Sequence, residues 1–113
     1  MLFRSVKQLL RMREAPHKLL YGISLRMRQL LVARVCLEQR LGESSFMELS
    51  GVRYPFQAKA MMSSAGGTSL ETCKSLVLAC SEAAYYMNSG DDPAKQLTEL
   101  FTRLVFFMSG DRL

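Results

Sequence analysis

The side chains best suited to catalysis are few in this sequence, and they do not stand in a catalytic pattern. A nucleophilic serine, threonine or cysteine needs a base within reach, and the only histidine, His17, directly follows Pro16 where a helix is expected to begin. Most acidic residues fall at expected helix starts and turns, where interaction with free backbone N–H groups accounts for them. We therefore expect no catalytic residues and a domain that is not an enzyme.

Metal and phosphate sites also lack their usual spacing. The closest two of the three cysteines, Cys73 and Cys80, are seven residues apart, whereas zinc ligands are typically separated by about two to four residues. Together with Cys36 they make an odd number, which does not fit a secreted disulfide scaffold, so reduced and half-buried thiols are expected. The Gly-Gly pair at residues 66–67 lacks the lysine and the glycine spacing of a P-loop. We expect no metal, no cofactor and no small-molecule substrate.

Positive charge is the clearest chemical bias of the chain. The net charge is +5, and residues 1–41 hold nine Lys and Arg against two acids, while the remainder holds six against eight. A basic segment of this kind favours a polyanion or an acidic protein surface as a neighbour, although a solvated face explains it equally well. Weak DNA binding that depends on salt and not on sequence is one expectation. The candidate contact residues for a partner or DNA are Arg11, Arg13, Arg26, Arg28, Arg34, Arg53, Gln57 and Lys59.

Arg34 stands apart because it interrupts an apolar stripe between Leu30 and Leu41. A charge at such a position is costly unless it is paired or hydrated. Two explanations stay open: the aliphatic stem packs while the head reaches water, or the head forms a salt bridge with an acid on another helix or subunit.

The elements that must position these residues are helices, because every apolar segment repeats at helical spacing and none alternates as a strand does. Pro16, Pro55 and Pro93 suit first turns, and Ser44 or Ser45 and then Thr68 are expected as N-caps. The sequence predicts an all-α, compact bundle of about six helices in a single domain, residues 1–113. The expected helices span residues 3–13, 16–41, 45–50, 55–64 and 68–87, and a last one starts at residue 93.

The helix from residue 55 has an expected buried set of Phe56, Ala60 and Met61. The apolar residues of the last helix are Leu97, Leu100, Phe101, Leu104, Val105 and Met108. No apolar run approaches the ~20 residues of a membrane span, and the N-terminus does not resemble a secretory signal. A cytoplasmic protein without membrane contact is expected.

The segment 45–62 has the outline of a helix-turn-helix, whose second helix would enter the DNA major groove. Arg53, Gln57 and Lys59 would then contact base edges. Apolar residues dominate the second helix, which favours packing over base reading. Sequence-specific DNA binding is kept as the alternative function.

The order and spacing of several motifs resemble the C-terminal collar domain of the delta subunit of the bacterial DNA polymerase III clamp loader. The similarity spans nearly the whole chain. One departure is Tyr54 before Pro55, where that family often has histidine. The motifs that carry the resemblance are LRMRQLL at 25–31, LEQRLG at 37–42, MELSGV at 47–52, YPFQAK at 54–59 and NSGDDP at 88–93.

The resemblance implies a helical collar domain through which clamp-loader subunits form a circular pentamer. Delta subunits resemble AAA+ proteins but are not ATPases, and their clamp-gripping element lies in an N-terminal domain, so we expect this chain to be a C-terminal fragment of a longer protein. Its expected function is non-catalytic oligomerisation that supports sliding-clamp loading in DNA replication. The expected partners are other clamp-loader subunits, with weak DNA contact as a further expectation.

Overall fold

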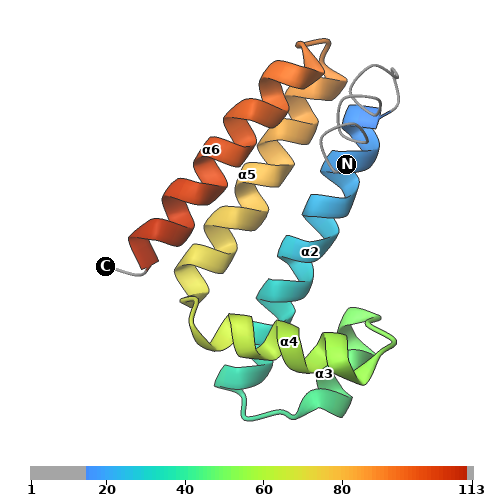
Figure 1. Ribbon diagram of the computed structural model, residues 1–113, viewed down its shortest axis with the longest axis vertical. Coiled ribbons are helices and arrows are strands. Elements are labelled where there is room, and N and C mark those ends of the chain that lie inside the picture. Colours follow the sequence, from blue (N-terminus) through green and yellow to red (C-terminus); the bar gives the residue numbers. More distant parts are fainter. Residues whose placement is uncertain (1–14, 112–113) are drawn as a thin grey trace.

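The computed structural model describes residues 15–111, and this part of the chain is all-α without strands (Figure 1). The all-α prediction is confirmed, with five helices in the described range instead of about six. The helix expected over residues 3–13 lies outside the described residues. The helices are α2 (Ala15–Glu38), α3 (Glu43–Ser50), α4 (Pro55–Gly66), α5 (Leu70–Asn88) and α6 (Pro93–Asp111).

Three long helices form the body of the bundle. Helix α5 lies between α2 and α6 and packs against both, so the three run side by side (Figure 1). The shorter helices α3 and α4 pack against each other and against α2, and α4 crosses the end of the long helices. The turn between α3 and α4 is therefore placed beside α2.

The three prolines lie in first turns, as predicted, because their missing N–H has no partner there. The end of α2 was expected at Leu41, and this is wrong. The helix ends at Glu38, and Arg40 takes a left-handed conformation with φ 58°. The Leu41 N–H donates to the carbonyl of Cys36 at 2.8 Å, which closes the helix in a Schellman-type turn.

The predicted cap of α3 is wrong. The helix begins at Glu43 after Gly42, and no side chain caps it, so neither Ser44 nor Ser45 has that role. Glu43 in the first turn places negative charge at the positive end of the helix dipole.

The N-cap of α5 is Ser69, one residue after the predicted Thr68. The Ser69 Oγ accepts the N–H of Thr72 at 3.1 Å. Thr68 instead donates its hydroxyl to the carbonyl of Ser64 at 3.1 Å, at the end of α4. Both residues are suitable caps by type, so the path of the chain between the helices decides between them.

All five described helices contribute to the core, which combines large and small side chains. Phe46, Leu76 and Leu100 are fully buried, and Leu30 is buried as expected. The three cysteines are buried and not half-buried, so that expectation is wrong. The remaining buried apolar residues are Leu20, Ala33, Val52, Ala58, Ala65, Ala79, Ala83, Met87, Leu97 and Leu104.

The predicted buried set of α4 is wrong for two of its three residues. Met61 is half-buried and packs against the core. Phe56 is 71% exposed and Ala60 is exposed, because the small Ala58 and Ala65 face the core instead. Small side chains there let α4 approach its neighbours closely.

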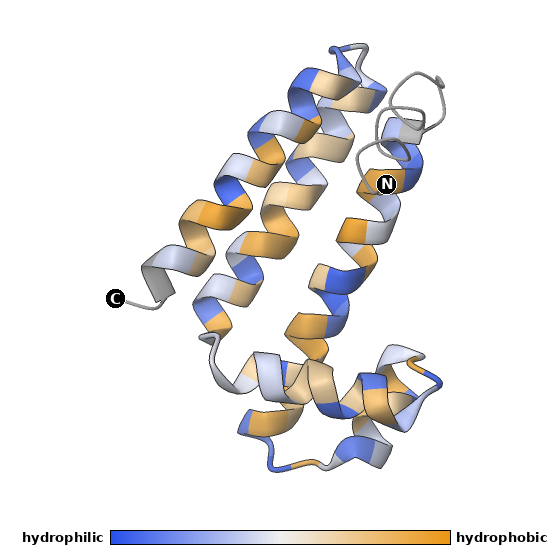
Figure 2. Cartoon of the chain, viewed as in Figure 1, coloured by the Kyte–Doolittle hydropathy of each residue, from blue (hydrophilic) through white to orange (hydrophobic). Residues whose placement is uncertain are grey.

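In α6, Leu97, Leu100 and Leu104 are buried. Phe101, Val105 and Met108 are 48%, 64% and 41% exposed, so they do not belong to the core of the chain. Figure 2 shows that hydrophobic residues nevertheless recur along the central turns of α6.

Candidate functional site

Three of the eight predicted contact residues line one groove between α2 and the α3–α4 turn. Arg26 comes from α2, Arg53 from the turn, and Gln57 from the first turns of α4. The groove has a volume of about 350 Å³. Its other lining residues are Gly22, Leu25, Gln29, Gly51, Val52 and Tyr54.

The turn that carries Arg53 is anchored by the two residues that precede it. Gly51 has a left-handed φ of 79°, and its N–H donates to the carbonyl of Met47 at 3.0 Å, which ends α3. The Val52 N–H then donates to the Ser50 Oγ at 3.3 Å, and the Val52 side chain is buried. Arg53 therefore projects to the surface from a fixed point of the backbone.

The groove is electropositive. None of its lining residues is acidic, and neither Arg26 nor Arg53 forms an ion pair with any residue from 15 to 111. The Gln29 Oε1 atom is buried and has no hydrogen-bond partner within the same range. The groove thus offers two cations to a ligand, whereas the unsatisfied Gln29 oxygen lies beneath the surface.

Arg28 lies in a different groove, between α2 and α5, and does not join Arg26. Its Nε donates to the carbonyl of Ser24 at 3.4 Å, and the same groove includes Cys80. Burial raises the pKa of the Cys80 thiol, and a hydrogen bond with Ser24 and the charge of Arg28 oppose this increase only in part. The thiol therefore stays protonated near neutral pH, which is unfavourable for nucleophilic chemistry.

Arg34 makes two contacts in the described chain, and neither is a salt bridge to an acid on another helix. Its Nε lies 3.3 Å from Oε1 of Glu38, an acid on the same helix. Its Nη1 donates to the backbone carbonyl of Ala65 at 3.2 Å. The side chain therefore ties α2 to the last turn of α4, which is a structural role.

The remaining candidates do not gather at one site. Lys59 is exposed on α4 and does not line the groove. Arg11 and Arg13 lie outside the described residues.

Of the three proposed base readers, only Lys59 is exposed within α4, because Arg53 precedes the helix and Gln57 is half-buried in the groove. The helix-turn-helix outline exists, but α4 presents Phe56 and few polar groups outward.

Sequence analysis missed Leu25 and Gln29 as members of the groove. Together with Gly22 and Arg26, these residues are spaced three and four apart on α2, which places them on one helix face. That spacing next to a candidate arginine is the signal that would have found them.

Residues 15–111 contain no group of three or more His, Cys, Asp or Glu side chains arranged to hold a metal ion. None of the helices in this range combines the length and apolarity that crossing a bilayer requires.

Comparison with protein families gives a match to the DNA polymerase III delta subunit, C-terminal domain, over residues 2–104. The match covers nearly the whole chain. This chain belongs to that family. Comparisons with curated proteins and with solved structures found no match. The delta C-terminal domain is a component of the clamp loader in DNA replication, so the resemblance seen in the sequence is confirmed.

Proposed function

We propose that this delta C-terminal domain is a non-catalytic oligomerisation module that joins other clamp-loader subunits and so supports sliding-clamp loading. The observation that carries the proposal is the apolar stripe of α6, formed by Phe101, Val105 and Met108. These residues are four and three positions apart and are therefore neighbours on the helix surface. All three are exposed.

The apolar stripe is not needed for the fold of the described chain. Leu97, Leu100 and Leu104 already supply the buried face with which α6 packs on its neighbours. An additional exposed apolar surface costs solubility and marks interaction sites in many proteins. A helix face of another clamp-loader subunit is the matching partner surface, since helices pack through such stripes.

Co-migration in size-exclusion chromatography tests this proposal. The chain and its Val105→Asp variant are each mixed with clamp-loader motor subunits. Val105→Asp should abolish co-migration, because a carboxylate in an apolar interface is strongly unfavourable without a partner. Circular dichroism of the variant should be unchanged, since Val105 is exposed.

Phe106→Asp is the matched control on the same helix. Phe106 is 74% exposed and is rotated by about 100° from Val105 around the helix, outside the apolar stripe. This variant should still co-migrate. Failure of the unsubstituted chain to co-migrate, or equal loss in both variants, would contradict the proposed use of the stripe.

Contact with DNA stays a prediction that rests on charge alone. The net charge of +5 favours phosphate binding. Fluorescence anisotropy at low and moderate salt should show weak binding that falls steeply with salt and does not discriminate sequences. Charge reversal at Arg11 and Arg13 should lower it, and binding that survives high salt would contradict the prediction.

A further inference from the structure

Helices α2 and α5 leave a groove between them that oligomerisation through α6 does not use. It consists of two adjoining pockets of about 240 and 180 Å³, which share Ser24, Arg28 and Ala84. No residue of α6 lines either pocket. The other residues that line this α2–α5 groove are His17, Leu20, Tyr21, Val77, Cys80, Ser81 and Asn88.

We propose that the α2–α5 groove is the docking surface for residues 3–13 of the same chain, which pack into it as a helix antiparallel to α2. The segment would cover the outer face of α2 and α5 and leave the apolar stripe of α6 free for other subunits. The proposal is independent of the proposed function.

The groove and the segment have matching lengths. The groove runs from His17 to Arg28 along α2 and from Val77 to Asn88 along α5. Eleven residues of helix rise by about 16 Å, which is the distance along each wall and also the length of a helix over residues 3–13. The segment is joined to α2 by very few residues, and Pro16 prevents one continuous helix. Connections this short place two helices side by side and antiparallel.

Small side chains in the middle of the groove leave room for a helix. These are Ser24 of α2 and Ser81 and Ala84 of α5. Large apolar side chains lie uncovered beside them, because Leu78 and Tyr85 are within four residues of Ser81 on the same helix and are 58% and 67% exposed. A helix with large apolar residues on one face fits such a surface.

The segment has that face. Phe3, Val6 and Leu10 are spaced three and four residues apart, and Leu9 lies beside them. A helix of this length is marginal in water by itself, so it needs a surface to pack on. The family match over residues 2–104 includes the segment, which therefore belongs with the helices that form the groove.

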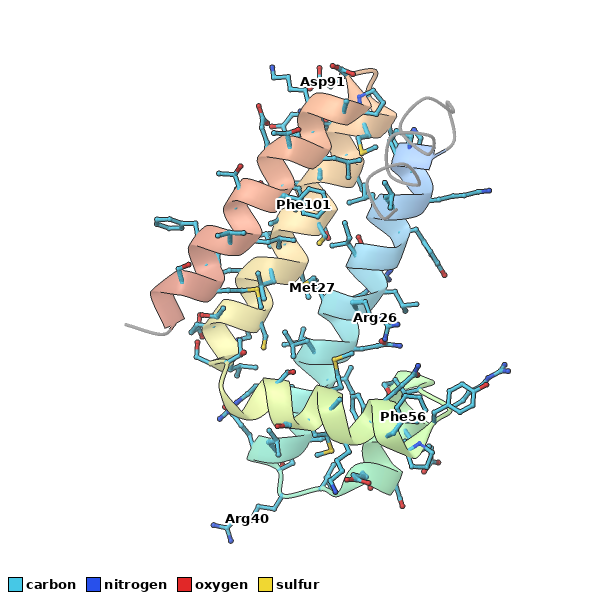
Figure 3. The ribbon with its side chains drawn as sticks, viewed as in Figure 1. Arg26, Met27, Arg40, Phe56, Asp91 and Phe101 are labelled. Carbon is cyan, nitrogen blue, oxygen red and sulfur yellow. The ribbon has the colours of Figure 1, made fainter. Side chains whose placement is uncertain are left out.

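Charge complementarity supports the antiparallel direction. Asn88 lines the groove, and Asp91 and Asp92 follow it in the α5–α6 turn. Figure 3 shows Asp91 at the end of the bundle where α2 begins. Neither carboxylate forms an ion pair with any residue from 15 to 111. Arg13 continues the face of Leu10 at the end of the segment nearest to α2, so an antiparallel helix brings it to these acids.

Other occupants fit the groove less well. A helix of another protein or of a second copy competes with a segment that is tethered at the edge of the groove, and the tether gives the segment a high effective concentration. Nucleic acid needs several cations along its backbone. Arg28 is the only lysine or arginine among the described residues that line the groove.

Photo-crosslinking within the 113-residue chain tests the position of the segment. Benzoylphenylalanine replaces Phe3, whose ring it resembles, and the products of irradiation at low concentration are mapped by mass spectrometry. They should join residue 3 to the end of the groove at Arg28 and Val77, within one molecule. The same probe at Gln8 is the matched control, because Gln8 is rotated by about 200° from Val6 and faces away. It should give little product.

Hydrogen exchange tests the docking without a probe. The amides of residues 3–13 should exchange at least about tenfold more slowly in the chain than in a synthetic peptide of residues 1–14. Ala84→Phe fills the middle of the groove and should remove this protection, whereas Ala60→Phe at an exposed position of α4 should keep it. Val6→Asp should also remove it while the groove itself is unchanged. Circular dichroism checks that α2 to α6 remain folded in each variant.

Three results would overturn the proposal. The first is cross-linking from residue 3 to α6 or to a second molecule, and the second is exchange as fast in the chain as in the peptide. The third is protection that survives both Ala84→Phe and Val6→Asp. Val105→Asp should leave the protection and the cross-link intact, so failure here is distinguishable from failure of the proposed oligomerisation.

Discussion

Replacing Arg34 with methionine removes its contacts with Glu38 and with the Ala65 carbonyl and keeps a flexible stem of similar length. The Nη1 atom donates to the Ala65 carbonyl at 3.2 Å, and Nε lies 3.3 Å from Glu38 Oε1. The Arg34 side chain is 25% exposed, and that of Glu38 is 41% exposed. Solvent therefore screens the ion pair more than the hydrogen bond to the backbone.

The expected loss follows from these two contacts. A hydrogen bond to a charged group contributes roughly 1.5–3 kcal/mol. The bond to Ala65 is long, and its carbonyl keeps the N–H of Thr68 as a second donor at 3.1 Å, so a value of about 1 kcal/mol is expected. The exposed pair with Glu38 adds about 0.3–0.5 kcal/mol. Arg34→Met should therefore lower the free energy of unfolding by about 1.5 kcal/mol.

Urea denaturation followed by circular dichroism measures this loss. Glu38→Gln is the control, because it removes the ion pair and leaves the bond to Ala65, so it should cost at most about 0.5 kcal/mol. Raising the salt concentration should reduce the difference between Glu38→Gln and the unsubstituted chain. A loss below about 0.5 kcal/mol for Arg34→Met, or an equal loss for both variants, would refute the structural role of the contact with Ala65.

Three further predictions concern the core and the backbone. Leu30→Ala should cost roughly 2–5 kcal/mol in urea denaturation, and a loss below about 1 kcal/mol would contradict its burial. Gly51→Ala should destabilise the fold by about 1 kcal/mol because residue 51 has a positive φ. Gly22→Ala, at an open position within a helix, should instead stabilise the fold by about 0.5–1 kcal/mol. Stability changes of the same sign in both variants would contradict these two predictions. Burial raises the pKa values of the Cys36 and Cys80 thiols. The protonated thiols therefore contribute fully to stability below the unfolded pKa of about 8.5, and this contribution is lost as pH rises through the folded pKa values. Replacing Cys36 with alanine should flatten this decline of the unfolding free energy with pH, and an unchanged slope would contradict the prediction.

The fold was largely predictable because its signals are local. Pro16, Pro55 and Pro93 mark first turns through the chemistry of proline itself, and helical spacing is visible within each segment. Helix ends were less predictable. Arg40 takes a left-handed conformation that normally favours glycine, and adjacent serine and threonine residues cap equally well by type.

Which apolar residues are buried depends on neighbours that the sequence does not display. Ala58 and Ala65 face the core of the bundle because small side chains permit close helix packing, while Phe56 remains at the surface. Hydrophobic residues commonly remain exposed, so type alone does not determine burial. The exposed Phe101 and Val105 on α6 illustrate the same limit.

The candidate site was predictable only as a set of residue types. Charge identified Arg26, Arg28 and Arg53 together, but the turn after α3 brings Arg53 to Arg26 and leaves Arg28 in another groove. Gln29 gave no signal by itself, because an amide in an amphipathic helix normally faces solvent. The Gln29 Oε1 atom is buried without a hydrogen-bond partner among the described residues, and only the folded chain shows this.

Photo-crosslinking from position 105 asks whether α6 is the surface that meets other clamp-loader subunits. Benzoylphenylalanine replaces Val105 in the 113-residue chain, which is mixed with the motor subunits and irradiated, and the same residue at Glu99 serves as the control because that exposed position lies outside the apolar stripe. An oligomerisation module predicts a covalent product with a motor subunit from position 105 and little from position 99. Products from position 99 alone, or none from position 105 in a mixture that co-migrates, would show that the domain assembles through another surface.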